Sequence, residues 1–316
     1  MYPRLLQIPL PFHIGGIDTI TIYSFGAMVA VAVLTAAWLA RVEMDRLYAA
    51  GRLKGVRIPV ADKGKNRRRT TYQVVSPSAL VGTLVVMVVV FGFIGAKLFH
   101  ILENLDSFML GPLGMIFSSG GFTFYGGLIM AGLAIAWYMR KHDLNVPTVA
   151  DALAPGLMLG YGIGRIGCHL AGDGDWGIPS NLSAKPDWLP TWLWAETYPH
   201  NILGVHIPPP GVYPTSVYEF LMAAALFGVL WAVRKHPFKA GWLFSLYLVL
   251  NGIERFLIEL IRVNNEFTEF GVTFTQAEFI AVCLILAGGI GLAFTTRRRQ
   301  AAAPATASST VASTTA

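Results

Sequence analysis

The chain has 316 residues, of which 54% are apolar and only 13% are charged. Soluble globular domains carry about 25% charged residues, so this composition excludes an ordinary water-soluble domain. The net charge of +6 would make nucleic acid the first partner to consider for a soluble protein. Here the basic residues fall in a few short connections between apolar blocks, which is typical of membrane topology signals. We therefore expect a membrane protein with no nucleic-acid partner.

Apolar blocks of spanning length run along most of the chain. About 20 apolar residues cross the roughly 30 Å hydrocarbon core as a helix. The blocks predict an all-α polytopic protein with about seven transmembrane helices, at residues 20–40, 78–101, 122–138, 149–166, 215–233, 241–261 and 276–294. The third and fourth blocks are short and glycine-rich, which fits either a re-entrant or broken helix or close helix packing.

Lysine and arginine set the predicted orientation. Ten lie in the basic insertion 41–77, two follow the third block, three follow the fifth and three follow the seventh, which together make eighteen of the 24. Because cytoplasmic loops are enriched in these residues, the N-terminus is predicted outside and the C-terminus inside. We expect the insertion to be attracted to anionic lipids of the inner leaflet.

The same pattern divides the chain into three parts. An outer N-terminal segment (1–19) precedes a transmembrane domain (20–295), and a cytoplasmic Ala/Ser/Thr-rich tail (296–316) is predicted to be disordered. The longest outer connection, 167–214, is predicted to form a small head on the outer leaflet. Prolines, glycines and an aspartate interrupt residues 1–19, so no cleavable signal peptide is expected there.

The sixth block contains ionisable side chains, including Glu254, Arg255 and Glu259, with Arg262 just beyond. Such residues are costly within a span and usually face a partner or a wet cavity. Arg255 shares a helix face with Glu259 and Arg262, because they lie four and seven residues apart. Two interpretations remain: an ion pair that joins helices, or a site for phosphate or carboxylate, which suits the planar guanidinium fork.

A glycine-rich stretch, residues 160–177, overlaps the end of the fourth block and contains Arg165. Glycines there allow the backbone to approach a ligand closely. Asp173 and Asp175 are expected to orient Arg165 or to shape the turn, since two acids and one histidine are weak evidence for a metal. We expect no metal and no cofactor, and Cys168 and Cys283 show no disulfide pattern.

Polar residues also stand at the outer ends of other blocks. Tyr125, directly before a Gly-Gly pair, fits either a cavity-lining tyrosine or an interfacial one. Thr215 or Ser216 is predicted to cap the fifth helix, which places Glu219 one turn inside it. Lys97 is predicted to extend its ammonium group toward the nearby interface.

Together these residues resemble the prolipoprotein diacylglyceryl transferase family over about residues 15–295. The most specific piece is Gly164-Arg165-Ile166-Gly167, followed by an acidic, glycine-rich turn that ends at Gly177. The supporting pieces are Tyr23, Gly95-Ala96-Lys97-Leu98, Gly126-Gly127-Leu128-Ile129, Pro214-Thr215 with Tyr218-Glu219, Arg255-Phe256 with Glu259 and Arg262, and Thr275-Gln276.

The resemblance implies a transferase in the bacterial cytoplasmic (inner) membrane, with its active site toward the outer leaflet. Its substrates would be phosphatidylglycerol and the lipobox cysteine thiol of prolipoprotein signal peptides, and its products a thioether and glycerol phosphate. The residues that it implies as catalytic are Tyr125, Arg165, Arg255 and Glu259. Those implied to bind the lipid and its phosphate are Arg165, Arg255, Arg262, Tyr23, Gly126 and Gly127, with Cys168, Asp173, Gly177, Tyr218 and Glu219 in support.

The chain departs from the family pattern where Tyr125 replaces a histidine and Cys168 an asparagine. Tyrosine, with a pKa near 10, is a poorer base than histidine at neutral pH. The thiol proton would then pass to Asp173, Glu219 or His169, or no such base is needed, or the function has changed. The alternatives are a non-catalytic phospholipid-binding or transport protein, and a different lipid-headgroup transferase. Inverted repeats, typical of transporters, are not evident in the sequence.

Overall fold

The computed structural model describes residues 1–14, 17–61, 70–118, 120–263, 266–269 and 272–297. Five helical segments are long and apolar enough to cross a membrane. They are Ser24–Ala49 (α1), Pro77–Glu103 (a 3-10 turn, Pro77–Leu80, followed by α2, Val81–Glu103), Val146–Ala171 (α6), Thr215–Val233 (α7) and Gln276–Thr295 (α9). The protein is therefore a polytopic helical membrane protein. The tip of the basic insertion, 62–69, and the predicted disordered tail beyond residue 297 lie outside the described residues.

Two further helices occupy the third and sixth predicted spans. These are α5 (Phe124–Lys141) and α8 (Trp242–Glu259), each of 18 residues. They are not among the five, because α5 ends in two basic residues and α8 contains two glutamates and an arginine. Both α5 and α6 are continuous helices, so the re-entrant alternative is not supported, and glycines such as Gly126 and Gly162 lie at close helix contacts.

Antiparallel hairpins accompany the helices, so the prediction of an all-α chain was wrong in this respect. Within the described residues they are β1 (Arg4–Ile14) with β2 (Ile17–Tyr23), β3 (Val56–Ala61) with β4 (Thr70–Val75), and β5 (Glu266–Glu269) with β6 (Val272–Thr275). Consecutive β-branched residues, as at positions 19–22 in β2, favour strands over helices. The helix predicted to begin at residue 20 consequently begins at Ser24, after β2.

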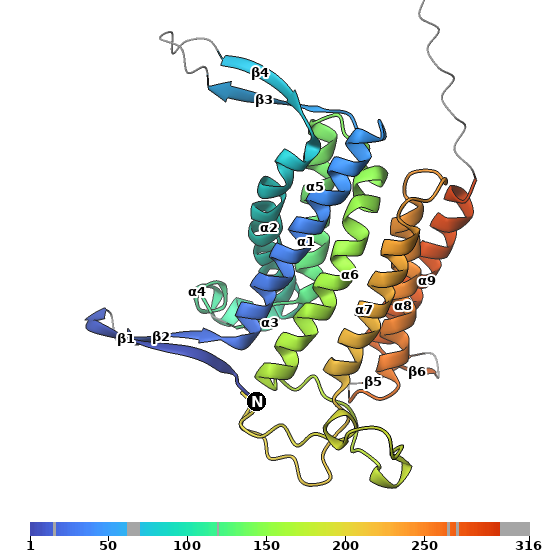
Figure 1. Ribbon diagram of the computed structural model, residues 1–316. Helices are drawn as coiled ribbons and strands as arrows, with labels where there is room; N and C mark the ends of the chain where they lie inside the picture. The colour runs from blue at the N-terminus through green and yellow to red at the C-terminus, as the bar shows by residue number, and fades with distance from the viewer. Residues whose placement is uncertain (15–16, 62–69, 119, 264–265, 270–271, 298–316) are drawn as a thin grey trace, which may run out of the picture.

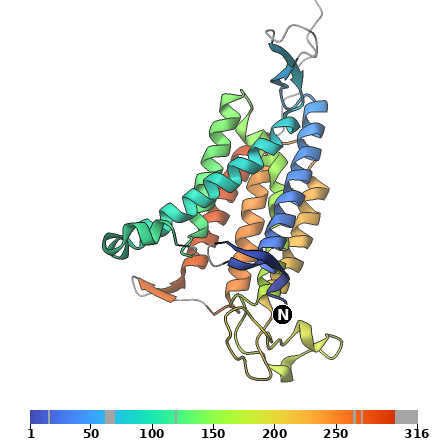
Figure 2. The same ribbon diagram turned by 90° about the vertical axis from the view of Figure 1, so that its left-hand side faces the viewer.

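Helix α6 is the central element of the bundle. It packs against α1 on one side and against α7 and α8 on the other, while α2 pairs with α5 and α8 pairs with α9 (Figure 1). Figure 2 shows α2 leading away from the bundle to two short helices, α3 (Leu105–Leu110) and α4 (Pro112–Ile116). The central position of α6 allows its side chains to meet residues from several other helices.

The two ends of the bundle differ in character. At the basic end lie the C-terminal ends of α1, α5, α7 and α9 and the β3–β4 hairpin (Figure 1). At the opposite end, called here the head end, lie the N-terminus, β1–β2, β5–β6 and the long connection between α6 and α7 (Figures 1 and 2). The described basic residues that were predicted to share one side, such as Arg46, Arg140 and Arg234, lie at the basic end.

Local sequence fixes the limits of α6 and α9. The Asn145 side chain accepts a hydrogen bond from the Thr148 amide and caps the start of α6 (3.0 Å). Gly172 follows the last residue of α6 with φ of 60°, a conformation that glycine adopts easily. Thr275 and Glu278 form a reciprocal capping box at the start of α9. The end of α6 at Ala171 places the connection 172–214 at the head end.

Buried charged residues also join helices at the basic end. Glu43 of α1 accepts hydrogen bonds from Arg46 (2.9 Å, Nε) and from Arg234, just beyond α7 (3.0 Å, Nε). Asp151 of α6 accepts hydrogen bonds from the backbone amides of Gly241 (2.7 Å) and Phe244 (2.8 Å), which are orphan donors at the start of α8. The start of α8 is therefore capped by a side chain from another helix.

Candidate functional site

Three arginines converge on a single carboxylate at the head end of the bundle. Glu219, in the second turn of α7, is fully buried. One of its oxygens, Oε2, bonds to Arg165 of α6. The other, Oε1, lies 3.4 Å from Nη1 of Arg255 of α8 and 3.4 Å from Nη1 of Arg262. The sequence predicted each of these residues as part of the site, and the structure brings all four together.

Asp175, from the turn after α6, is a second bridge between arginines. Its carboxylate bonds to Nη1 of Arg165 (2.5 Å) and to Arg262. Burial by itself would raise the pKa of Asp175, but the adjacent guanidiniums of Arg165 and Arg262 hold that pKa below its usual value. Asp175 is therefore ionised at neutral pH, and it orients Arg165 as expected of this acidic turn.

Hydroxyl groups at the start of α7 hold that turn in place. Thr215 Oγ1 and Ser216 Oγ donate to the backbone carbonyl of Asp175, at 2.9 and 2.8 Å. The prediction that one of them caps α7 was wrong, since the N-cap position is Pro214 and no side chain caps the helix. The hydroxyls instead attach the head connection to α7.

The intrahelical pair predicted on α8 is present. Nη2 of Arg255 lies 3.1 Å from Oε2 of Glu259, four residues later. Arg255 thus reaches Glu219 with one nitrogen and Glu259 with the other. Its side chain is 20% exposed, compared with 13% for Arg165 and 9% for Arg262, so Arg255 is the most accessible of the three guanidiniums.

Tyr161 and Glu254 extend the cluster away from the head end. The hydroxyl of Tyr161 lies 3.3 Å from Oε1 of Glu219 and 3.3 Å from Oε1 of Glu254, which is 2% exposed. Glu254 was predicted as one of the ionisable residues of its span, whereas Tyr161 was not predicted to belong to the site. The available signal was spacing, because Tyr161 lies one helical turn before Arg165 and so shares its face.

Cys168 and Asp173 lie beside the cluster. Sγ of Cys168 is 3.6 Å from Nη1 of Arg165, and the backbone amide of Asp175 donates to Asp173 (3.3 Å). The ligand atoms of Cys168, Asp173 and Asp175 lie within 4.8 Å of one another, a spacing that would allow a cation. However, Arg165 and Arg262 already neutralise Asp175, which opposes cation binding. We assign no metal to this site.

Gly177 and Tyr218 connect the head to the bundle. The amide of Gly177 donates to Tyr213 O, and the next amide, of Ile178, donates to Ile261 O, both at 2.9 Å. A Cβ at Gly177 would lie 2.7 Å from Ile261 O, which is too close for any other residue without a shift. The hydroxyl of Tyr218 donates to Leu193 O in the head (2.7 Å). Through these contacts both residues attach the head to the bundle, and their support of the site stays a prediction.

Other residues predicted for the site lie on different elements. Tyr23 ends β2 and is 47% exposed, and the ring of Tyr125, on α5, contacts Phe124. Gly126 and Gly127 are buried where α5 crosses α2, and a Cβ at Gly127 would lie 2.7 Å from Gly92 O. The ion pairs and hydrogen bonds described above for the cluster involve none of these four residues. Their proposed contact with lipid stays a prediction.

Lys97 of α2 does not extend to an interface as predicted. It is 8% exposed, and its ammonium group donates to Ser118 Oγ (2.7 Å), Ser118 O (3.1 Å) and Gly120 O (2.9 Å). It also lies 4.7 Å from the centre of the Phe122 ring. Lys97 therefore fixes the segment that leads into α5 and Tyr125.

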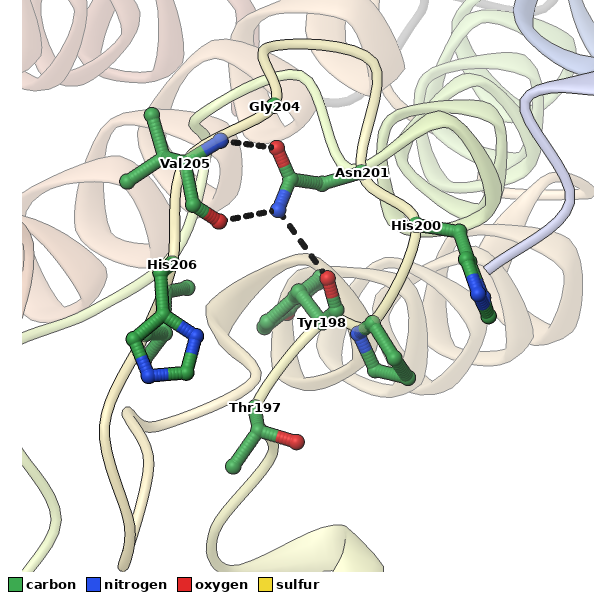
Figure 3. A pocket seen from close by; sticks show the side chains of 9 residues that line it. Thr197, Tyr198, His200, Asn201, Gly204, Val205 and His206 are labelled. Atoms are coloured by element: carbon green, nitrogen blue, oxygen red, sulfur yellow. Dashed lines mark hydrogen bonds between the residues drawn. The ribbon is translucent and has the colours of Figure 1, made fainter.

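A separate pocket of about 240 Å³ lies within the head connection (Figure 3). Asn201 shapes it by accepting a hydrogen bond from Val205 N (3.0 Å) and donating to Val205 O (2.6 Å) and Tyr198 O (3.0 Å). Burial and nearby acids raise the pKa of Tyr198 above its usual value, so its ring is a neutral core group of the head. None of the predicted site residues lines this pocket.

Fold and site together define a polytopic membrane protein with a buried arginine–carboxylate cluster at one end of its bundle. A sequence model of the family "Prolipoprotein diacylglyceryl transferase" matches residues 11–294. The chain therefore belongs to the prolipoprotein diacylglyceryl transferase family.

Proteins named "Phosphatidylglycerol--prolipoprotein diacylglyceryl transferase" are similar to this chain. One from Clostridium tetani is 28% identical over 254 residues, which cover 80% of this chain and 85% of that protein. One from Pseudomonas paraeruginosa is 32% identical over 224 residues, covering 69% of this chain and 75% of that protein. One from Leptospira interrogans is 34% identical over 151 residues, covering 47% of this chain and 44% of that protein.

Proposed function

We propose that this protein transfers the diacylglyceryl group of phosphatidylglycerol to the lipobox cysteine of prolipoproteins. The convergence of Arg165, Arg255 and Arg262 at the head end carries the proposal. Family membership supplies the reaction, and the cluster supplies a place where a lipid phosphate could be held.

The reaction forms a sulfur–carbon bond and breaks a carbon–oxygen bond of the lipid. The bonding electrons move onto the oxygen of the departing glycerol phosphate, and the thiol gives up its proton. Guanidiniums that hold the phosphate stabilise this developing charge. Arg255 is the arginine that lipid would reach first, because it is the most exposed of the three. Glu259 keeps its guanidinium in position, and Asp175 does the same for Arg165.

The thiol proton needs an acceptor other than Glu219. Both oxygens of Glu219 already face guanidinium nitrogens, and the group is fully buried. Asp173, at the rim of the cluster in the head turn, remains as a candidate base alongside Tyr125 and His169. Tyr125 stands where the resemblance to the family implies a histidine, so the proposed cavity would extend from the cluster toward α5.

The proposal includes a topology. The seven long helices of the described residues would cross the bacterial cytoplasmic (inner) membrane, with the N-terminus outside and the C-terminus inside. The head end would then face the outer leaflet, and the basic end would face the cytoplasm, in agreement with the enrichment of basic residues in cytoplasmic loops. Prolipoprotein signal peptides and phosphatidylglycerol would both reach the cluster from the outer leaflet.

Complementation tests the function directly. In a bacterial strain depleted of its own transferase, the full chain should restore growth and yield prolipoprotein with a thioether-linked diacylglyceryl group, detected by mass spectrometry. The variants R165A and R255A should lose at least about 100-fold in transfer rate. R140A, at the basic end, is the matched control and should behave as the wild type. Normal membrane insertion without thioether product would disprove the transferase, and active R165A and R255A would disprove the site.

A further inference from the structure

The hydroxyl of Tyr161 lies between two carboxyl groups, but its single hydrogen can be donated to only one of them. Its hydroxyl lies 3.3 Å from Oε1 of Glu219 and 3.3 Å from Oε1 of Glu254. A tyrosine hydroxyl can donate only one hydrogen bond, although it can also accept one. The arrangement is satisfied if one carboxyl group is protonated and donates to Tyr161 while the other is ionised and accepts from it.

The surroundings decide which carboxyl group carries the proton. Glu219 faces three guanidiniums, which stabilise its negative charge. Glu254 is 2% exposed and its Oε2 has no hydrogen-bond partner among the described residues, while the adjacent guanidinium of Arg255 is directed at Glu219 and Glu259. A buried, unpaired carboxylate is strongly disfavoured relative to the neutral acid. The proton therefore resides on Glu254.

The groups that face Glu254 come from three helices. Helix α9, which packs on the opposite side of α8, places Ala281 and Ile285 against Gly252. The titratable and charged groups around Glu254 are Tyr161 and Arg165 from α6, Glu219 from α7, and Tyr247 and Arg255 on α8 itself. Neither arginine forms an ion pair with Glu254 in the structure, since both bind Glu219.

The charge balance of the cluster depends on this proton. Three arginines face three ionised carboxylates, those of Asp175, Glu219 and Glu259. With Glu254 neutral these charges cancel, and with Glu254 ionised the cluster has a net charge of −1. An incoming phosphodiester brings a further negative charge into a buried site, where like charges repel strongly.

We propose that Glu254 is a proton-carrying member of the phosphate site, and that the arginines accept an anionic lipid phosphodiester only while Glu254 keeps its proton. The inference rests on the proposed function, because it takes the arginine cluster as the phosphate site. Glu254 acts through Tyr161 and Glu219, so it is a positioning residue. By linkage, lipid affinity is constant at low pH and falls by up to about tenfold per pH unit as Glu254 ionises.

Replacing Glu254 with glutamine tests the proposal, because the amide is neutral at every pH and has nearly the same shape. The full chain is placed in nanodiscs of neutral phosphatidylcholine, and binding of spin-labelled phosphatidylglycerol is measured from about pH 6 to about pH 10. Wild type should lose affinity toward high pH, whereas E254Q should keep its low-pH affinity throughout. The matched control E103Q removes an acid outside the cluster and should follow the wild-type curve. A merely structural role for Glu254 would not produce binding that persists at high pH.

Parallel pH curves for wild type and E254Q would overturn the inference, as would loss of binding by a folded E254Q at every pH. If E254Q does not fold, proton uptake by the wild type on lipid binding at high pH provides the second measurement. Uptake supports the proposal and its absence overturns it. The two proposals fail differently: pH-linked binding without thioether formation would refute only the transferase, and thioether formation with parallel curves would refute only the role of Glu254.

Discussion

Removing the charge of Glu219 is the most direct test of the cluster. In E219Q one carboxylate oxygen becomes an amide NH₂, which cannot accept a hydrogen bond. Because Oε2 meets Arg165 and Oε1 meets Arg255, Arg262 and Tyr161, at least one guanidinium would face a donor in either orientation of the amide. Removing one partner of a buried ion pair destabilises a protein by about 3–5 kcal/mol. We expect a loss in this range in the free energy of unfolding, measured by reversible unfolding in mixed micelles.

The matched control for E219Q is E43Q. Glu43 is also buried and also binds two arginines, Arg46 and Arg234, but it lies at the basic end. E43Q should lower stability while leaving the transfer rate unchanged, whereas E219Q should lower stability and also reduce the transfer rate by about 100-fold or more. An E219Q protein within about 1 kcal/mol of wild type would refute the description of Glu219 as a required counter-charge.

Further predictions concern groups outside the arginine cluster. Burial, together with Arg52 and Arg46, lowers the pKa of His236 to about 4 from 6.5. The unfolded chain therefore binds more protons, and stability should fall as pH drops from about 6.5 to about 4, by at most about 3 kcal/mol. H236Q should remove this loss in a thermal unfolding series, and an unchanged pH profile would contradict it. G126A should destabilise the protein because a Cβ there collides with Phe99, whereas G132A on the same helix, where the space is open, should not. Equal melting temperatures for the two variants would argue against the packing role of Gly126. K97M removes three hydrogen bonds from a buried ammonium and should cost about 2–4 kcal/mol in unfolding free energy, with K97R as the milder control.

The helices were largely predictable from the sequence because hydrophobic blocks of spanning length are required by the bilayer itself. The hairpins were not predicted, since β1, β3 and β4 lie outside the apolar blocks that reveal spans and β2 overlaps the start of the first block. The limits of α1 were also missed at both ends: it begins at Ser24 and continues to Ala49, into the predicted basic insertion. Hydropathy detects where a chain enters lipid but does not detect where a helix continues into water.

Part of the site was equally predictable. Arg255 and Glu259 follow from helical spacing alone, which is a local property. Local spacing does not predict which acids bind Arg165, because Glu219 is 54 residues away on another helix and Asp175 is ten residues away across a turn. Thr215 or Ser216 was predicted to cap α7 because capping depends on the local sequence. In the structure their hydroxyls instead donate to the backbone carbonyl of Asp175, which is a tertiary contact.

The capping of α8 by Asp151 has a consequence for how the protein enters the membrane. A charged residue at the centre of an inserting helix costs about 2.5–3.5 kcal/mol, and α8 carries Glu254 and Arg255 in its second half. Its first amides are also bound by a carboxylate of α6. The bilayer alone would therefore accept α8 poorly, and its insertion would be favoured once α6 and α7, which precede it in the chain, are already in the membrane. The order of the helices in the chain is thus also a workable order of insertion.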